Sequence, residues 1–177
     1  GAYSGNASYV IYGGNYLHGA TTTQGTSGND TLTGTAGADI IVAGDGNDTI
    51  TSGGGIDTVY GGAGNDIIGI SDSTFMRIDG GNGDDTLRLD TNNMLLDFTN
   101  IAQNKVIGID NIDMTGSGNN TVTLNARDLV DMSDNSVIHI NGDAGDTVVA
   151  TGGFTLQGTA GGYNHYSVVG SHIDLYI

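Results

Sequence analysis

Residues 25–69 read GTSGNDTLT GTAGADIIV AGDGNDTIT SGGGIDTVY GGAGNDIIG, which is one nine-residue pattern written five times without a gap. Each unit has a glycine two places before an aspartate and an apolar residue two places after it. The glycines are Gly28, Gly37, Gly46, Gly55 and Gly64, the aspartates are Asp30, Asp39, Asp48, Asp57 and Asp66, and the apolar residues are Leu32, Ile41, Ile50, Val59 and Ile68. A short period kept this strictly predicts a solenoid of stacked units.

The polar part of each unit is suited to a hard cation. Glycine permits positive φ and lets carbonyl oxygens turn inward, while the short Asp side chain keeps its carboxylate inside the turn. Calcium takes six to eight oxygen ligands, which two stacked turns can supply and one turn cannot. A single Gly-Asn-Asp would be ordinary turn chemistry, but rows of carboxylates repel one another without a cation. We therefore predict that these aspartates and glycines bind several Ca²⁺ ions.

A period of eighteen residues lies inside the period of nine. The residue between Gly and Asp is Asn29, Asn47 or Asn65 in the odd units and Ala38 or Ile56 in the even ones. Two rows of turns on opposite edges of a flattened roll would leave this alternation. We predict an all-β fold, a parallel β-roll (β-solenoid) in which one coil takes two units. The predicted partners across neighbouring coils are Asp30 with Asp48, Asp48 with Asp66, and Asp39 with Asp57.

The period fails once, over residues 70–79, and this stretch moves the phase by one. The pattern then resumes in residues 80–89, GGNGDDTLRL, where Gly83 and Asp85 occupy the ligand positions. We interpret the break as a bulged or looped-out unit, and we add Gly83 and Asp85 to the predicted calcium ligands. Three further aspartates lie in or beside turns and are equally compatible with solvent or with a cation: Asp45, Asp72 and Asp84.

Composition narrows the class of partner. The 177 residues include 20 acidic residues, all of them Asp, against 4 basic ones, for a formal net charge of −16. Nucleic acid and anionic lipid surfaces need clustered Lys and Arg, so neither is an expected partner. There is no Cys for disulfides or thiolate sites, and no apolar run approaches the roughly 20 residues that span a bilayer. Calcium is the staple that this composition allows.

The chain divides into three segments by pattern. Residues 1–24 are expected to cap the first coil or to link it to an upstream module, and the start without Met favours a fragment of a longer protein. Residues 25–89 are expected to form the calcium-binding roll. Residues 90–177 lack the period, and their short apolar runs predict an antiparallel β cap that protects the last edge of the roll. Within this segment Asn125 is expected to N-cap a helical turn that extends through Asp131.

A weaker copy of the turn occurs in residues 142–146, GDAGD, one residue short of the repeat spacing. We favour a further calcium site with Asp146 as ligand, and a tight hairpin is the alternative. Three other aspartates are expected to cap or solvate the helical turn: Asp128, Asp131 and Asp134.

Signals of an enzyme are absent from the sequence. It contains no HExxH, GxSxG, P-loop or Cys-His pair. Its four histidines are scattered without metal-ligand spacing: His18, His139, His165 and His172. We therefore expect a protein that is not an enzyme.

The repeats in residues 25–89 resemble those of RTX proteins, which bacteria export by type I secretion. Residues 109–124, IDNIDMTGSGNNTVTL, followed by NARDLVDMSD and INGDAGDTV, resemble the C-terminal module of the very large RTX adhesins of Gram-negative bacteria, a group that includes biofilm and ice-binding adhesins. The resemblance implies a monomeric module behind upstream adhesin domains, secreted or on the cell surface, which carries an uncleaved C-terminal secretion signal for the type I machinery. It also implies folding on extracellular calcium. The sequence has no ordinary N-terminal secretory signal, in agreement with a C-terminal one.

Two other classes stay open at this point. The chain could be the calcium-roll tail of a secreted protease or lipase, or a ligand-binding module for ice or a glycan. Ice-binding RTX rolls resemble this one but repeat Thr just before the Gly-Asn-Asp. Here that position holds Ser27, Ala36, Asp45, Gly54 and Ala63. We therefore do not expect this segment to bind ice.

Overall fold

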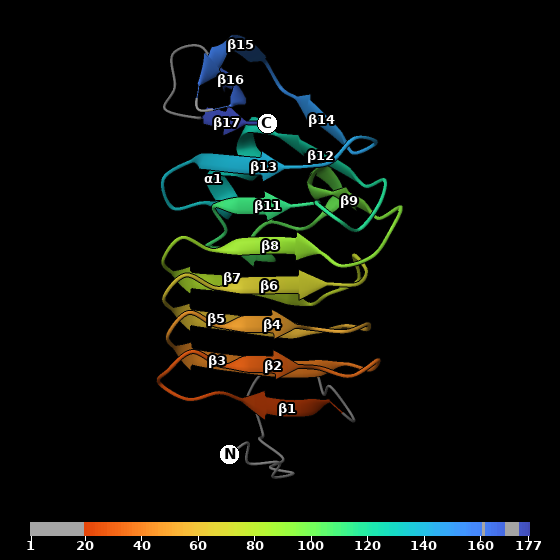
Figure 1. Cartoon of the computed structure of the whole chain (residues 1–177), viewed down its shortest axis with the longest axis vertical. Helices are drawn as coiled ribbons and strands as arrows, with labels where there is room; N and C mark the ends of the chain where they lie inside the picture. Colours follow the sequence, from red (N-terminus) through yellow and green to blue (C-terminus); the bar gives the residue numbers. More distant parts are fainter. Residues whose placement is uncertain (1–19, 161, 169–173) are drawn as a thin grey trace.

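The chain is a stack of β-strands wound along one long axis (Figure 1). The computed structural model describes residues 20–160, 162–168 and 174–177. These residues are mostly β-strand with one short α-helix, in agreement with the predicted all-β class. Most of the segment expected to cap the first coil or to link it to an upstream module, residues 1–19, lies outside the described residues.

Three sheets contain all the named strands of the described residues. The first has the order β1 (Thr21–Gln24), β3 (Asp39–Asp45), β5 (Thr58–Ala63), β7 (Arg77–Asn82), β10 (Val106–Ile107). The second begins with β2 (Thr31–Thr33), β4 (Thr49–Thr51), β6 (Ile67–Ile70), β8 (Thr86–Leu89), β11 (Asn111–Asp113), β13 (Val137–Asn141) and ends with β17 (Asp174–Tyr176), β16 (Tyr163–Val168), β15 (Phe154–Ala160). The third has the order β9 (Leu95–Asp97), β12 (Thr121–Asn125), β14 (Thr147–Thr151).

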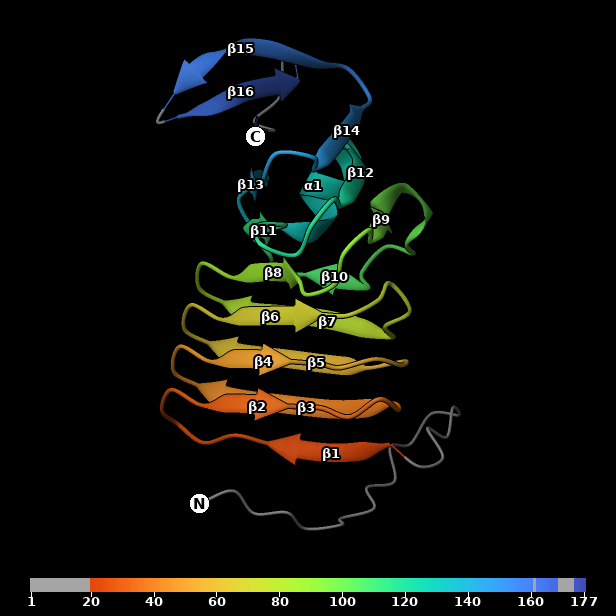
Figure 2. The ribbon, with the colours of Figure 1, turned by 45° about the vertical axis from the view of Figure 1, so that its right-hand side comes forward.

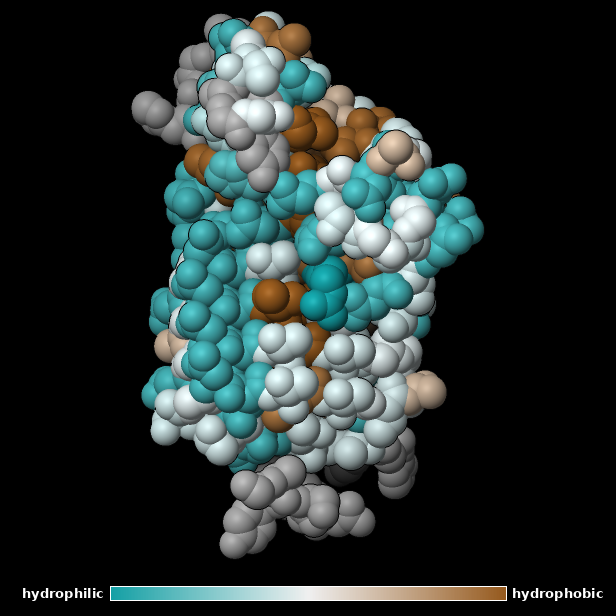
Figure 3. All heavy atoms as spheres, viewed as in Figure 1, coloured by the Kyte–Doolittle hydropathy of each residue, from teal (hydrophilic) through white to brown (hydrophobic). Residues whose placement is uncertain are grey.

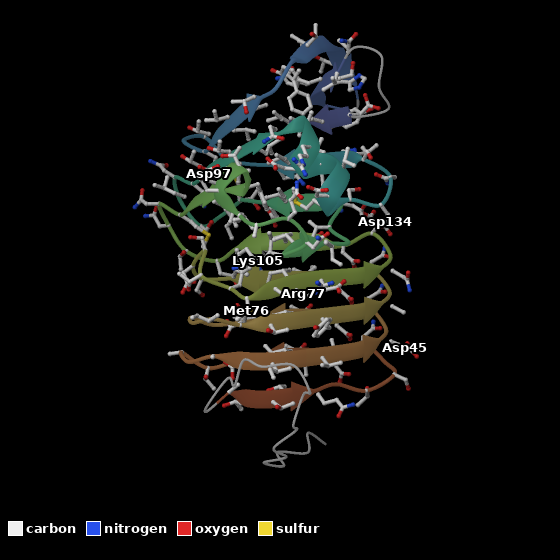
Figure 4. All side chains as sticks on the ribbon, turned by 180° about the vertical axis from the view of Figure 1, so that it is seen from behind. Asp45, Met76, Arg77, Asp97, Lys105 and Asp134 are labelled. Atoms are coloured by element: carbon white, nitrogen blue, oxygen red, sulfur yellow. The ribbon has the colours of Figure 1, made fainter. Side chains whose placement is uncertain are left out.

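From β1 to β8 consecutive strands alternate between the first and second sheets, and all pairings are parallel. Thr31 pairs with Thr49, and Thr49 pairs with Ile67, so that one coil takes 18 residues. The prediction that one coil takes two nonapeptides is therefore confirmed. The turns form two rows on opposite edges of the stack (Figure 1), and Figure 4 shows Asp45 at one of these edges.

The core of this half lies between the two sheets. The apolar residue of each nonapeptide points inward, and Ile41, Ile50, Val59 and Ile68 are completely buried. Branched side chains suit such ladders because each stacks on another branched apolar side chain one coil away, as Ile41 does on Val59. Burying one such side chain contributes about 1.5–3 kcal/mol. Leu32, in the first coil of the second sheet, is only partly buried.

The break in the period is absorbed within a bend, and both sheets continue across it. Thr58 pairs with Arg77, and Ile67 pairs with Thr86, so this coil takes 19 residues in place of 18. Phe75 lies in the bend, is buried at 3% exposure and belongs to the hydrophobic core. The stretch is thus a bulged unit within the stack, as predicted.

The prediction of an antiparallel cap is wrong for most of the C-terminal half. Strands β9 to β14 pair in parallel, and among the described residues of this half only β15 with β16 and β16 with β17 are antiparallel. Thr86 pairs with Asn111, and Asn111 pairs with His139, so these coils take 25 and 28 residues. Winding continues while the coil lengthens to include the third sheet (Figure 2). A longer and uneven coil leaves no short period in the sequence.

The short helix α1 (Ala126–Met132) begins where it was predicted. Asn125 is its N-cap, and its side chain accepts hydrogen bonds from the backbone N–H groups of Arg127 and Asp128, while the backbone N–H of Asn125 donates to the Asp128 carboxylate. This reciprocal pair is a capping box. The helix contacts β10, the last strand of the first sheet, and its Leu129 and Met132 are buried in the core. It therefore covers an edge that would otherwise be open.

The segment before the five perfect units also contributes to the stack. Strand β1 pairs with β3, with Thr21 opposite Asp39, and so adds a strand to the first sheet.

Among the described residues, no helix has the length and apolar character needed to cross a membrane.

Candidate metal centres

Aspartates of neighbouring coils are joined by hydrogen bonds in two ladders. The nonapeptide positions are numbered here so that the aspartate is position 6. In the first row, the backbone N–H of Asp30 donates to Oδ1 of Asp48 at 2.7 Å, that of Asp48 to Asp66 at 2.8 Å, and that of Asp66 to Asp85 at 2.8 Å. In the second row, the N–H of Asp39 donates to Oδ1 of Asp57 at 2.9 Å. The structure thus brings together every aspartate pair that the sequence predicted.

Several of these carboxylates keep one oxygen buried and without a hydrogen-bond donor. These oxygens are Oδ2 of Asp48, Asp66 and Asp85, and Oδ1 of Asp39. All four residues are at most 1% exposed. A buried ionised oxygen without a partner costs several kcal/mol. A bound cation between the coils would remove that cost.

Backbone carbonyl oxygens converge on the same places. A Cβ atom added to Gly61 would lie 2.4 Å from the carbonyl oxygen of Gly80 and 2.4 Å from Oδ2 of Asp66. The same point at Gly25 would lie 2.2 Å from the carbonyl oxygen of Ala43 and 2.9 Å from Oδ2 of Asp30. Glycine at position 1 thus leaves a space without a side chain. The aspartate of the same unit and a backbone carbonyl of the next coil both face this space. Oxygen donors of both kinds are what Ca²⁺ prefers.

No group of three or more Asp or His side chains in the described residues is placed to hold a metal by itself. Backbone carbonyls would therefore have to complete any coordination shell here. This is compatible with calcium, whose sites combine carboxylates with carbonyls and water. The residues present fit that ion.

The predicted glycines divide into two groups. Positive φ is present at Gly46 (+110°), Gly55 (+113°), Gly64 (+125°) and Gly83 (+145°), as position 4 was expected to require. The remaining two, Gly28 and Gly37, do not have positive φ. Glycines at position 2, which were not among the predicted site residues, also have positive φ and lie against the backbone of the preceding coil: Gly44, Gly53, Gly62 and Gly81.

We expect Gly62→Ala to destabilise the protein by roughly 2 kcal/mol or more. Its φ is +123°, and an added Cβ would lie 1.9 Å from the carbonyl oxygen of Gly44, which is backbone and cannot swing aside. Gly28→Ala is the matched control, because no atom lies within 4 Å of an added Cβ there. Urea unfolding of both variants in calcium measures the difference. Equal unfolding free energies would show that this close approach between coils is not needed.

An asparagine ladder explains the alternation at position 5. The Asn29 side-chain oxygen accepts from the backbone N–H of Asn47 at 2.9 Å, and Asn47 accepts from Asn65 in the same way at 2.9 Å. Asn65 then accepts from the N–H of Asp84 at 3.1 Å. Figure 3 shows a hydrophilic column along this edge of the molecule. The alternating period therefore reflects backbone pairing in one row of turns.

The second row ends earlier than the first. After Asp39 and Asp57, the place of the next aspartate in this row is taken by Met76. The backbone N–H of Met76 donates to the carbonyl oxygen of Asp57. Asp72 instead reaches the turn of Asp57 and accepts from the N–H of Gly55 at 3.3 Å and of Thr74 at 2.8 Å. Burial alone would raise the pKa of Asp72, but the hydrogen bonds from Thr74 and Gly55 lower it below its usual value. Asp72 is thus held as an ionised turn residue.

Asp45 and Asp84 are both exposed to solvent. The Asp84 carboxylate accepts from the side-chain amide of Asn111 at 2.6 Å. Neither residue has an oxygen that is buried without a partner. We leave both out of the candidate centres.

The turn around Asp146 makes the same backbone-to-carboxylate hydrogen bond as the ladders, but it has no carboxylate oxygen without a donor. Oδ1 of Asp146 accepts from the N–H of Asn120 at 2.7 Å, and Oδ2 accepts from the N–H of Asp143 at 2.6 Å. A Cβ on Gly142 would lie 3.0 Å from the Met114 methyl group, where the repeats have a carbonyl oxygen. Both carboxylate oxygens are thus occupied and the space is lined by an apolar atom. We do not include Asp146 among the proposed ligands.

The described histidines lie away from these centres. His139 and His165 stack on the two sides of Tyr176 on the second sheet, at centroid distances of 4.7 and 4.6 Å. His165 also lies 2.8 Å from the Asp174 carboxylate. His18 and His172 lie outside the described residues.

Protonation of the ladder gives a pH-dependent expectation. Burial raises the pKa of Asp85 to about 7; the Asp66 N–H lowers it, and the charges of Asp66, Asp110 and Asp84 raise it further. A carboxyl whose pKa is higher in the folded state than in the unfolded state stabilises the fold at low pH, and this contribution is lost as pH rises from about 4 to about 7. The calcium-free protein should therefore be more stable at pH 5 than at pH 8.

Calcium titrations at pH 6.5 in buffers of different ionisation enthalpy provide the measurement. We expect the apparent binding enthalpy to change with the buffer, because calcium displaces a proton from a carboxyl of raised pKa. A binding enthalpy that is the same in all buffers would contradict this expectation.

Comparison with known families bears on these two ladders. A family model for the RTX calcium-binding nonapeptide repeat matches in four copies, over residues 24–59, 49–68 and 77–93. The chain carries RTX calcium-binding nonapeptide repeats. The gap between residues 68 and 77 coincides with the bend that absorbs the extra residue. A search among curated proteins found no match.

The RTX repeats identify calcium as the ion for these centres in general terms. They include the aspartates of both ladders from Asp30 to Asp85, and they end before β10, α1 and the third sheet. The match to the repeat family therefore does not extend to the later coils, which contain β10 to β14 and α1.

Proposed function

We propose that the chain is a calcium-dependent folding module, a β-roll whose RTX repeats are stapled by several Ca²⁺ ions bound between coils. The observation that carries this proposal is the set of buried carboxylate oxygens without a donor, at Asp39, Asp48, Asp66 and Asp85. At an effective dielectric constant of about 20, charges about 5 Å apart repel by roughly 3 kcal/mol. Calcium replaces this repulsion by attraction, so binding free energy becomes folding free energy.

The ligands we assign come from position 6 and from glycine-bearing turns. They are the aspartates Asp30, Asp39, Asp48, Asp57, Asp66 and Asp85, with backbone oxygens of the turns that contain Gly28, Gly37, Gly46, Gly55, Gly64 and Gly83. Calorimetric titration tests this assignment. We expect several ions with dissociation constants of about 10⁻⁴ to 10⁻³ M, as in extracellular calcium modules, and much weaker binding of Mg²⁺. Absence of calcium binding would refute the proposal.

We further propose that this module serves export of a large bacterial adhesin. Low calcium inside the cell would leave the aspartate rows repelling and the chain extended, while extracellular calcium in the millimolar range would fold it outside. The resemblance of residues 109–124 to adhesin C-terminal modules supports this role. The chain would then act as a monomer with type I secretion machinery and upstream domains as partners, without catalysis of its own.

Export can be tested directly. The chain fused behind a reporter protein should reach the medium of a Gram-negative bacterium that expresses a type I secretion system. It should stay inside a matched strain that lacks the inner-membrane transporter. Equal retention in both strains would contradict the secretory role while leaving calcium binding intact.

The ligand-binding alternative has one observation in its favour. Thr31 and Thr33 pair with Thr49 and Thr51, and these side chains alternate with the core-facing Leu32 and Ile50, so they form two outward columns. The next coil interrupts both columns with Ile67 and Gly69. Four threonines on two coils make a small array, and we expect no inhibition of ice recrystallisation by this chain at micromolar concentration.

A further inference from the structure

The first aspartate ladder extends beyond the repeats to Asp110. The backbone N–H of Asp85 donates to Oδ2 of Asp110 at 3.2 Å. The N–H of Asn111 donates to the carbonyl oxygen of Asp85 at 2.9 Å, the same bond that Thr86 makes to Asp66 at 2.8 Å. Asp110 lies 25 residues after Asp85 and outside the residues matched as RTX repeats, so no short period reveals it.

The space between Asp85 and the coil of Asp110 has the features of the centres between repeats. A Cβ on Gly80 would lie 1.9 Å from the carbonyl oxygen of Gly108 and 2.7 Å from Oδ2 of Asp85. Asp85 is 0% exposed, and this Oδ2 has no hydrogen-bond partner. A carboxylate oxygen in complete burial thus faces a carbonyl oxygen supplied by the next coil, as at Gly61.

No basic side chain neutralises this cluster. All four Lys and Arg residues of the chain have partners elsewhere: Arg77 with Asp79, Arg88 with Asp90, Arg127 with Asp131, and Lys105 with the carbonyl oxygen of Phe75. Figure 4 shows Arg77 and Lys105 on the broad face of the stack. They lie away from the edge where the Asp45 turn stands, and this edge carries the row of turns to which Asp85 belongs. Asp84, Asp85 and Asp110 are therefore neighbouring carboxylates without a cationic partner.

The C-terminal end of α1 orients the Asp110 carboxylate. Ser133, which is the C-cap of that helix and 3% exposed, donates its hydroxyl to Oδ1 of Asp110 at 2.9 Å. The backbone N–H of Ile109 donates to the carbonyl oxygen of Met132 at 3.0 Å. Asp110 is thus tied to the helix on one side and to the repeats on the other.

We propose that a further Ca²⁺ ion binds at this junction, with the carboxylates of Asp85 and Asp110 and the carbonyl oxygen of Gly108 among its ligands. The ion couples the repeats to the helix-bearing coil, so that calcium also orders the C-terminal half. This inference rests on the proposed function, because it assumes that the repeats bind calcium.

Anomalous scattering from crystals grown in calcium tests the junction site. We expect ions between the repeat coils and one more ion between Asp85 and Asp110. Asp110→Asn should lose that ion alone, and Asp113→Asn is the matched control, because Asp113 caps its own turn through Thr115 and should keep every ion. Ions between repeats without one at the junction would overturn the inference alone. The absence of all ions would overturn the proposed function as well.

A milder variant keeps the test informative if Asp110→Asn does not fold. Ser133→Ala keeps the carboxylate but removes the hydroxyl that orients it, and removal of such a supporting bond weakens metal sites by roughly 10-fold or more. Calcium titration should show one site weakened by that factor and the others unchanged. Hydrogen exchange of residues 106–139 should need correspondingly more calcium for protection. If neither variant changes the binding of any ion, the junction site does not exist.

Discussion

Chelation of calcium is expected to lower the thermal unfolding midpoint by roughly 20 °C or more relative to the protein in 10 mM calcium. An ion present at about 100 times its dissociation constant adds about 2.7 kcal/mol. Even three such ions would add about 8 kcal/mol, and each kcal/mol moves the midpoint of a domain of this size by roughly 2–4 °C. The effect is large because the buried oxygens of Asp48, Asp66 and Asp85 have no protein donor to replace the ion.

Differential scanning calorimetry in calcium, in magnesium and in chelator measures this shift. Magnesium is the control for ionic strength and charge screening, since it needs near-ideal octahedral geometry and dehydrates reluctantly. A midpoint in magnesium close to that in chelator would support a specific calcium site. Equal midpoints in calcium and chelator would mean that the ladders are stable without an ion.

Asp66→Asn is expected to have the largest effect of any single substitution in the ladders, and the sign of that effect should depend on calcium. Asp66 receives the N–H of Asp48 and donates its own to Asp85, so it stands between two centres. Loss of two ions at 10 mM calcium would destabilise the protein by about 5 kcal/mol. In chelator the same change removes one of the repelling charges, so it should be neutral or stabilising.

The matched control is Asp45→Asn, which removes one negative charge from an exposed position of the same row of turns. In calcium its unfolding free energy should change by less than about 0.5 kcal/mol. Urea unfolding of the wild-type protein and both variants in 10 mM calcium, and the far-UV circular dichroism of all three in chelator, measure the two conditions. An Asp66→Asn variant that loses stability in calcium and also loses β signal in chelator would assign Asp66 a packing role only.

The repeat half could be read from the sequence because each coil is closed by two identical turns. The spacing predicted the 18-residue register and the aspartate pairs, both of which the structure contains. The alternation of Asn47 with Ala38 and Ile56 indicated two rows of turns. Its physical cause, a hydrogen bond that the Asn47 side chain accepts from the backbone of the next coil, depends on the stacking and could not be read from the sequence.

Other features could not be predicted because they depend on residues far apart in the sequence. The parallel coils after β8 vary in length, so that Asp85 meets Asp110 without any repeated spacing. Asn120 takes the place of an aspartate opposite Asp146, which leaves the second turn motif without a partner carboxylate. In β1, Thr21 pairs with Asp39 and thus occupies the aspartate position of the repeat. Without that aspartate, the sequence does not show that β1 adds one more strand to the first sheet.

Far-UV circular dichroism during a calcium titration from chelator to 10 mM measures whether calcium folds the chain. We expect a weakly structured spectrum in chelator and a cooperative gain of β signal. The midpoint should lie at about 10⁻⁴ to 10⁻³ M calcium, without a comparable gain in magnesium. A full β spectrum in chelator, unchanged by calcium, would contradict the claim that the ions between the coils hold the fold together.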